Sequence, residues 1–296
     1  MKPILLFSLA LALSACNGNK NDFDATGAFE STEIIVSSEA NGKIMELNLQ
    51  EGDRLEAGAV LGYVDSMQLY LRKKQLEAGL RSVDIRKPDI RKQIASLEQQ
   101  IAVARSEQQR MENLVKAKAG NQKQVDDIVN NIKVLQKQQD AQYSTLHKTT
   151  SGADAEAESI VYQIMQLDDQ LQKSRIVNPQ SGTVLVKYAE PGEVTAAGKP
   201  LYKIADTDLL YLRAYPTAEQ LTQLKLGQQV RVFADFGEKG QKEYPGTITW
   251  ISEKSEFTPK GIQTKNERAN LVYAVKIAVR NDGYLKIGQY GEVLFK

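Results

Sequence analysis

Side chains that commonly carry chemistry are scarce in this chain. It contains one histidine, His147, and one cysteine, Cys16. A metal centre or a catalytic triad needs several such groups that converge, and His147 lies in a Gln- and Lys-rich stretch expected to be an exposed helix. The sequence has no glycine-rich loop of the kind that cradles phosphates. It therefore predicts a non-enzymatic protein with no catalytic, cofactor-binding or metal site.

The N-terminus is typical of an export signal. An apolar stretch runs from Ile4 to Leu13, and the small residues Ser14 and Ala15 follow it. At about ten residues it is too short to span a bilayer comfortably. The residues up to Cys16 resemble a bacterial lipobox, which implies cleavage before Cys16 and acylation of its thiol and new amino group. Two or more acyl chains would anchor the protein stably; the alternative is a chance cysteine after an ordinary signal.

Length and composition limit the remaining possibilities. The chain has 296 residues, of which 42% are hydrophobic and 25% charged, and its net charge is +1. These values permit two or three modest domains rather than one large core. A nearly neutral charge, with no cluster of Lys and Arg among aromatic residues, gives no support for nucleic-acid binding.

A short pattern occurs twice, in residues 40–64 and again in residues 180–204. The glycines of the two copies keep one offset of 140 residues, which pairs Gly42 with Gly182, Gly52 with Gly192, and Gly58 with Gly198. Glycine suits such positions because tight turns often need a positive φ. Two related halves this far apart predict one small β unit that is split by a long insertion.

The insertion has the pattern of a coiled coil. Residues 67–175 are rich in Gln, Lys, Glu and Leu, and apolar residues recur at a seven-residue step from Leu69 to Met111. This step is typical of a helical seam. The pattern stops near residues 118–122 and resumes beyond them. Two arms of about fifty residues around one turn predict an antiparallel hairpin roughly 75 Å long.

A joint is expected partway along this hairpin. Pro88 and Gly152 lie about 32 residues before and after the turn, so they should face each other, roughly 48 Å from the tip. Proline breaks helices, the residues around Gly152 are poor helix formers, and the seam slips by one residue there. We therefore predict that both arms are interrupted together, at residues 86–89 and 149–153. The alternative is one continuous, slightly bent hairpin.

The ends of the chain complete the expected organisation. Alternating apolar residues beyond residue 208 predict several short strands that form a small barrel. The expected divisions are a signal peptide (1–15), a lipidated tether with a first strand (16–33), the split β domain (34–66 and 176–207), the helical hairpin (67–175) and the β-barrel (208–296). The fold class is thus α+β, elongated and multidomain.

Two family resemblances follow from these features. The paired half-repeats resemble the biotinyl/lipoyl domain, a flattened barrel of two related halves. Carrier proteins of that fold bear their cofactor on a lysine between the halves, whereas Asp65, Ser66 and Met67 stand at this junction here. With the hairpin and the lipobox, the chain resembles HlyD-type periplasmic adaptors, also called membrane fusion proteins. Residues 256–264 resemble the barrel segment of adaptors that pair with ABC-type exporters.

The adaptor resemblance implies a function and a set of partners. Lipid on Cys16 would anchor the protein to the inner membrane of a Gram-negative bacterium, with the rest of the chain in the periplasm. The barrel end would contact an inner-membrane transporter, and the hairpin would reach an outer-membrane TolC-type channel. A ring, commonly of six subunits, would form a sealed conduit for small molecules or peptides. At the tip, Arg110, Leu114 and Asn121 occupy the places of the family's channel contacts, although the family usually has Ser where Asn121 stands.

Two other functions stay open from the sequence. One is a structural coiled-coil lipoprotein of the envelope without a channel partner, which the split lipoyl-like unit does not favour. The other is a lipoyl or biotinyl carrier, which the missing acceptor lysine does not favour. The exported substrate and the membrane that retains the lipid are not specified by the sequence.

Overall fold

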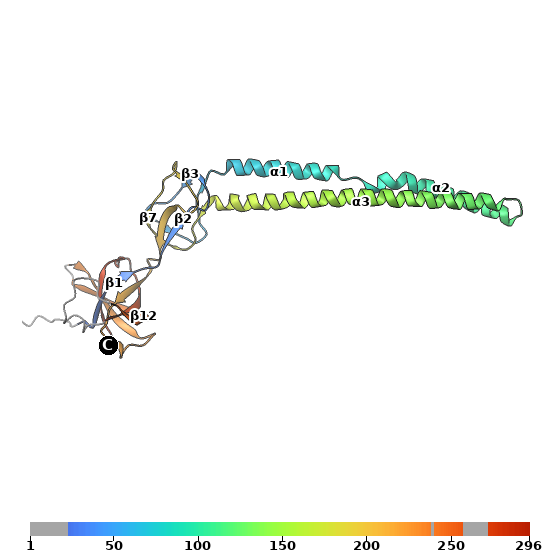
Figure 1. Ribbon diagram of the computed structural model, residues 1–296. Helices are drawn as coiled ribbons and strands as arrows, with labels where there is room; N and C mark the ends of the chain where they lie inside the picture. Colours follow the sequence, from blue (N-terminus) through green and yellow to red (C-terminus); the bar gives the residue numbers. More distant parts are fainter. Residues whose placement is uncertain (1–22, 238–239, 257–271) are drawn as a thin grey trace, which may run out of the picture.

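The computed structural model describes residues 23–237, 240–256 and 272–296. They form a β-barrel, a β-sandwich and a long helical hairpin that follow one another along an elongated molecule (Figure 1). The predicted class, an elongated α+β protein with several domains, is confirmed. Among the described residues, none of the helices is both long and apolar enough to cross a membrane.

The barrel is closed by six antiparallel strands in the order β1-β10-β13-β12-β11-β14. They are β1 (Ala25–Glu30), β10 (Leu209–Ala214), β11 (Gln229–Asp235), β12 (Gln241–Glu256), β13 (Val272–Arg280) and β14 (Tyr290–Leu294), with a short helix α4 (Ala218–Leu221) between β10 and β11. The interior is apolar, with Phe29 of β1, Leu212 of β10 and Ile277 of β13 fully buried.

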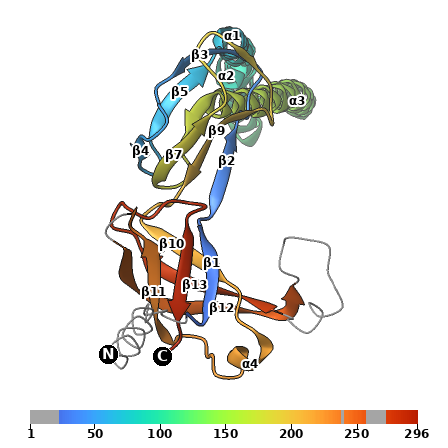
Figure 2. The ribbon, with the colours of Figure 1, turned by 90° about the vertical axis from the view of Figure 1, so that its left-hand side faces the viewer.

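The barrel was expected to consist of residues 208–296 alone, but it also contains strand β1. This strand pairs with β10 along one edge and with β14 along the other, so it fills the gap between them (Figure 2). Without it, β10 and β14 would be open edges, which proteins generally protect. The sequence pattern gave the strand but not its partners, because a barrel is closed by pairing between residues that lie almost a whole chain apart.

The sandwich has two four-stranded sheets, in the orders β2-β9-β7-β4 and β6-β5-β3-β8. The strands are β2 (Glu33–Ser37), β3 (Gly42–Leu47), β4 (Arg54–Leu55), β5 (Val60–Val64), β6 (Arg175–Val177), β7 (Gly182–Lys187), β8 (Val194–Thr195) and β9 (Pro200–Ala205). Strands β3, β4 and β5 start 140 residues before β7, β8 and β9. Each half lends its short strand to the other, since β3 pairs with β8 and β4 with β7.

The hydrogen bonds of the two halves also repeat at this offset. The amide of Gly52 donates to the carbonyl of Val184 at 2.9 Å, and the amide of Gly192 donates to the carbonyl of Ile44 at 2.8 Å. Ile44 and Val184 are themselves buried side by side in one apolar core. The predicted split domain with two equivalent halves is therefore the observed structure.

The hairpin consists of α1 (Met67–Arg86) and α2 (Ile90–Lys116), which both pack on one long helix, α3 (Gln122–Lys173). At 1.5 Å per residue the 52 residues of α3 extend roughly 78 Å. Apolar side chains at the seam are buried although the arms are thin: Val83, Ile101, Val125, Ile132, Leu146 and Leu167. Seam burial and not intrinsic helix propensity stabilises such long helices.

The expected joint is half wrong. The first arm breaks at residues 87–89, where Lys87 before Pro88 has an extended ψ of 129°, as a residue before proline prefers. The second arm does not break, because α3 runs continuously through Gly152. The prediction that both arms are interrupted together is therefore incorrect.

Local chemistry explains why α3 continues. The hydroxyls of Thr149 and Thr150 donate to the carbonyls of Thr145 and Leu146, one turn back, so they fit into the helix. A single glycine in a helix interior costs only about 1 kcal/mol. The seam slip is a stutter: the inward-facing residues step by four from Leu146 to Thr150. A stutter unwinds the supercoil locally without interrupting a helix.

Candidate functional site: the hairpin tip

The tip is the turn that joins α2 to α3. Two backbone hydrogen bonds close the end of α2: Ala119 N–H donates to Leu114 C=O and Lys118 N–H donates to Val115 C=O, both at 2.9 Å. This is a Schellman motif, which places one residue in the left-handed conformation. That residue is Lys118, with φ 59°. Gly120 follows because a Cβ there would lie 2.9 Å from the Val115 nitrogen.

The three residues expected at the tip occupy two helices. Arg110 and Leu114 lie one turn apart on α2, so they share a face, and the Leu114 side chain is 40% exposed. The guanidinium of Arg110 is exposed and pairs with the carboxylate of Glu107. Asn121 lies beyond the turn and caps α3, its side-chain oxygen accepting the amide of Lys123 at 3.0 Å.

This geometry gives Asn121 a role that the pattern did not predict. Ser and Asn are both good helix N-caps, so either residue satisfies the start of the second arm. The prediction that Asn121 contacts a channel stays a prediction. Arg110 is exposed and Leu114 is partly exposed, so both present surface that a partner could contact.

The tip is also cationic, a feature that sequence reasoning missed. Lys116, Lys118 and Lys123 lie within it, and no Asp or Glu occurs between Glu112 and Asp126. The sequence of residues 113–125 shows this excess of lysine. It indicates a cationic surface only when the turn is known to bring these residues together.

The turn glycines of the sandwich are set by backbone geometry. Gly52, Gly58, Gly192 and Gly198 have φ between +82° and +97°, a region that glycine adopts freely. Gly182 differs: its φ is not positive, but a Cβ there would lie 2.4 Å from the carbonyl oxygen of Ala205. Gly42 has φ 150° and a Cβ there would approach Val64. These residues form turns and close approaches and do not converge on a ligand site.

The remaining positions carry structure or fall outside the described residues. At the junction where carriers bear their lysine, Ser66 precedes α1 and the Asp65 side chain accepts the amide of Met67 at 3.0 Å. Pro88 forms the break in the first arm, while Gly152 lies inside a continuous helix. Cys16 and most of residues 256–264 lie outside the described residues.

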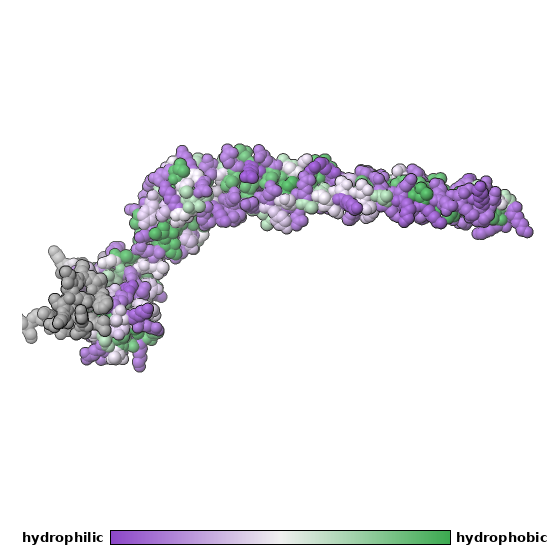
Figure 3. Space-filling view, viewed as in Figure 1, coloured by the Kyte–Doolittle hydropathy of each residue, from purple (hydrophilic) through white to green (hydrophobic). Residues whose placement is uncertain are grey.

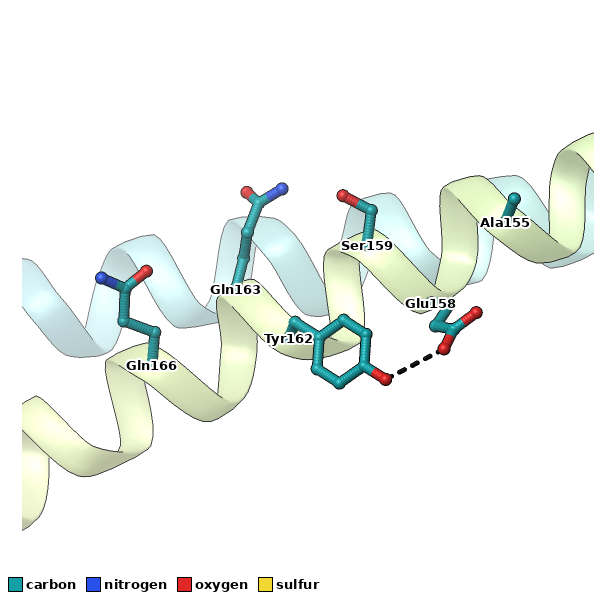
Figure 4. Close-up of a pocket in the computed structure, with 6 residues that line it drawn as sticks. All are labelled: Ala155, Glu158, Ser159, Tyr162, Gln163 and Gln166. Atoms are coloured by element: carbon teal, nitrogen blue, oxygen red, sulfur yellow. Dashed lines mark hydrogen bonds between the residues drawn. The ribbon is translucent and has the colours of Figure 1, made fainter.

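The hairpin carries hollows along its surface. One of about 520 Å³ is lined by α3 alone, through residues that include Tyr162, Glu158 and Gln166 (Figure 4). The Tyr162 hydroxyl donates to Glu158 Oε1 at 2.9 Å, so its polar group is engaged along the helix. On the face shown in Figure 3, the hairpin surface is mostly hydrophilic with scattered apolar side chains. Within the described ranges, no three His, Cys, Asp or Glu residues are grouped to hold a metal ion.

Comparison with known proteins relates this architecture to a family. Residues 32–207, which span the sandwich and the hairpin, match the family profile described as "RND MFP, barrel-sandwich hybrid domain". The chain is 28% identical to the UPF0194 membrane protein YE2891 of Yersinia enterocolitica, over 94% of this chain and 93% of that protein. It is 25% identical to a UPF0194 membrane protein of Acidithiobacillus ferridurans, over 88% of this chain and 83% of that protein.

Solved structures share the fold. MacA from Actinobacillus actinomycetemcomitans superposes with a TM-score of 0.54 at 21% identity, over 91% of this chain and 76% of that chain. The membrane fusion protein Spr0693 from Streptococcus pneumoniae R6 gives 0.53 at 18% identity, over 92% and 97%. With the family match over the sandwich and hairpin, the split domain and its inserted helices identify the chain as a member of the membrane fusion protein family.

Proposed function

We propose that this protein is a periplasmic adaptor that links an inner-membrane transporter of the ABC type to an outer-membrane channel of the TolC type. It would act as a ring, commonly of six copies, around a sealed conduit for small molecules or peptides. The observation that carries the proposal is the hairpin, whose tip stands at the opposite end of the molecule from the barrel (Figure 1).

The hairpin has the stiffness that a spacer needs. Besides the apolar seam, ion pairs join its two arms: Lys73 to Asp168 at 2.5 Å, Arg86 to Glu156 at 2.8 Å, and Lys87 to Asp154 at 3.0 Å. The last two lie where the break in the first arm begins, and hydrogen bonds to Asp84 and Asp154 raise the pKa of Lys87. Because α3 is continuous alongside the break between α1 and α2, we expect the hairpin to stay straight and stiff there.

The described chain begins at the barrel, which supports anchoring at this end. Phe23, the first described residue, packs on Phe233 of β11 with ring centroids 5.3 Å apart. Phe23 lies seven positions after Cys16, a reach of roughly 25 Å for an extended chain. A lipid on Cys16 would therefore hold the barrel close to the membrane and leave the hairpin free to extend away from it.

Exposed apolar side chains near the base of the hairpin support side-by-side assembly. Tyr70 and Leu71 of α1 are 48% and 46% exposed, and Tyr162 and Met165 of α3 are 61% and 59% exposed. Clustered exposed apolar residues commonly mark protein interfaces. Because the seam between α1 and α3 is already filled, these residues remain available to neighbouring copies of the chain.

The tip proposal is tested by position-specific photo-crosslinking in intact cells. A photoreactive residue at Leu114 should give adducts with an outer-membrane channel, identified by mass spectrometry. The same residue at Val134, which is 54% exposed on α3 away from the tip, should not.

The double variant Arg110→Asp, Leu114→Asp should lose co-purification of the channel while its thermal unfolding stays unchanged, since both side chains lie outside the cores. Arg105→Asp, an exposed residue on the same helix, is the matched control.

Two outcomes would contradict channel docking by the tip. Equal adducts at both positions, or unchanged co-purification of the channel with the double variant, would reject channel docking by this tip. It would leave the membrane fusion protein fold as it stands. Intact-mass measurement completes the test, because a lipoyl or biotinyl group on any lysine would restore the carrier alternative.

A further inference from the structure

The barrel carries a group of aromatic rings around one ammonium. The Nζ of Lys242, on β12, lies 4.9 Å from the ring centroid of Tyr284 and 5.4 Å from those of Phe236 and Tyr244. Phe236 and Tyr284 contact each other edge to face, with centroids 5.1 Å apart. Asp282 pairs with the same ammonium. Three rings and a carboxylate around a cation make the arrangement with which proteins recognise alkylammonium ligands.

Packing of the barrel core does not account for this cage. The buried core contains Tyr244 and Leu285, whereas Phe236 and Tyr284 lie outside it. Tyr284 is 60% exposed, although a tyrosine can usually bury much of its ring. Tyr284, Phe236 and Tyr244 also line a cavity of about 460 Å³, which Asp235 and Leu285 border from the neighbouring strand and loop. The three rings therefore border this cavity as well as Lys242, while Lys242 and Asp282 themselves are not part of its lining and lie beside it.

The cage would persist if Lys242 moved away. Asp282 Oδ1 accepts two further hydrogen bonds, from the Tyr244 hydroxyl and from the Tyr284 amide, both at 3.2 Å. These donors hold the carboxylate in place independently of the lysine. The Lys242 side chain is 38% exposed and belongs to a flexible residue type, so it can turn toward solvent without unfolding the barrel.

We propose that this cage and its cavity form a binding site for a small organic cation with a quaternary ammonium, for which Lys242 is an internal competitor. A quaternary ammonium is weakly hydrated compared with the lysine ammonium, so it loses less on entering an aromatic site. The proposal does not depend on the channel or on the transporter class. It assigns the barrel a ligand in addition to its place in the adaptor.

The probe is choline, with the neutral isostere 3,3-dimethylbutan-1-ol as its matched compound. Calorimetric titration of the purified full chain should show choline binding at least about tenfold more tightly than the isostere, the size expected of cation–π contacts plus a carboxylate. Lys242→Met should tighten choline binding several-fold, because it removes the competitor. Adding Asp282→Asn or Tyr284→Leu to that variant should abolish the gain.

Control variants separate a specific site from general stickiness. Tyr290→Leu removes another exposed aromatic residue, 74% exposed and outside the cage, and should leave choline binding unchanged. Equal binding of choline and its isostere, or no tighter binding after Lys242→Met, would overturn the proposal. Thermal unfolding of each variant shows whether the barrel is intact, and Lys242→Met is the decisive test because it replaces a partly exposed side chain outside the core.

Discussion

Lys118 is the residue with the least favourable backbone conformation at the tip. Within the described ranges it alone, among residues other than glycine, has a positive φ. The left-handed conformation costs an L-residue about 1–2 kcal/mol, and helices usually end on glycine at this position. A strained conformation that persists at an exposed turn is often retained for function. Here the strained residue is Lys118, whose side chain adds a third positive charge to those of Lys116 and Lys123.

Replacing Lys118 by glycine should therefore stabilise the tip. We expect a gain of up to about 1 kcal/mol, the relief of strain less the added freedom of the unfolded chain. Hydrogen exchange of the tip amides measures it directly. Lys116→Gly, inside the last turn of α2, is the matched control and should destabilise by about 1 kcal/mol. A loss of stability in both variants would contradict the argument.

Tyr202 is the second residue whose environment predicts a measurable effect. It is fully buried in the sandwich, its hydroxyl donates to Asn178 Oδ1 at 3.1 Å, and burial raises its pKa to about 12. In the unfolded chain the pKa of tyrosine is about 10. Below pH 10 both states keep the proton and stability is complete. Between pH 10 and 12 the unfolded state loses the proton first, so stability falls as pH rises.

The variant Tyr202→Phe should remove this alkaline loss. At pH 8 it should be less stable than the parent by about 1–2 kcal/mol, because Asn178 Oδ1 loses its donor. Between pH 9 and 11.5, however, its melting temperature should decline less steeply. Tyr290→Phe, at an exposed position, is the control. Parallel pH profiles of Tyr202→Phe and the parent would show that the buried hydroxyl does not control alkaline unfolding.

At the scale of elements, the hairpin shows what local pattern can and cannot predict. The spacing of apolar residues predicted both arms and the turn, because residues of a helical seam recur at regular intervals along each helix. Pro88 was predicted to break a helix and does, since its effect is local. The continuity of α3 could not be read in this way. The hydroxyls of Thr149 and Thr150 can be accommodated within a helix, and the seam that stabilises α3 is supplied from outside by α1 and α2.

Gly152→Ala tests this view of α3. A Cβ at Gly152 would meet no atom within 4 Å, so alanine should stabilise the helix by about 1 kcal/mol through its higher propensity. Thermal unfolding followed by circular dichroism measures the change. Gly52→Ala is the contrast, because φ there is +92° and the substitution should destabilise the sandwich. Reduced stability of Gly152→Ala would mean that the second arm needs a flexible point there after all.

The same distinction holds for the β elements and the proposed site. The repeated glycines predicted the sandwich because both copies carry the same turn requirements. The sequence did not predict that β1 closes the barrel, nor that Lys242, Phe236 and Tyr284 meet. The β11–β12 pairing brings Phe236 near Lys242, but Tyr284 and Asp282 come from a loop some forty residues further on. Nothing in the spacing of these residues marks them as neighbours.

At the scale of the whole molecule, each junction between domains is crossed by two segments of chain. The barrel and the sandwich are joined through residues 31–32 and 206–208, and the sandwich and the hairpin through residues 65–66 and 174. At the first junction Ser31 Oγ donates to the carbonyl of Asp206 at 2.5 Å, and Arg54 pairs with Asp208. Two connections resist twisting more than one would, so we expect rotation at the barrel to be passed on to the hairpin.

The anchor is the prediction that belongs to this scale. In cells, Cys16→Ala should abolish acylation and move the protein from the membrane fraction to the soluble fraction or leave it unprocessed, because lipid on Cys16 is the proposed attachment. Metabolic labelling with a fatty acid and carbonate extraction, in cells that lack neighbouring transport components, measure both effects. Retention of the variant in the washed membrane fraction would show that another attachment exists.

Along the sequence, the hairpin is inserted within the sandwich, and the sandwich is inserted within the barrel, between β1 and β10. This order has a consequence for how the chain acquires its structure after synthesis. The hairpin is built from residues 67–173 alone and can form as soon as α3 is available. The sandwich must then wait for its second half, and β1 waits for β14, more than 260 residues later. Distant pairings form slowly, so assembly should proceed from the middle outward. Truncation after residue 207 should leave the hairpin and sandwich folded and β1 without a partner, an exposed edge prone to aggregation.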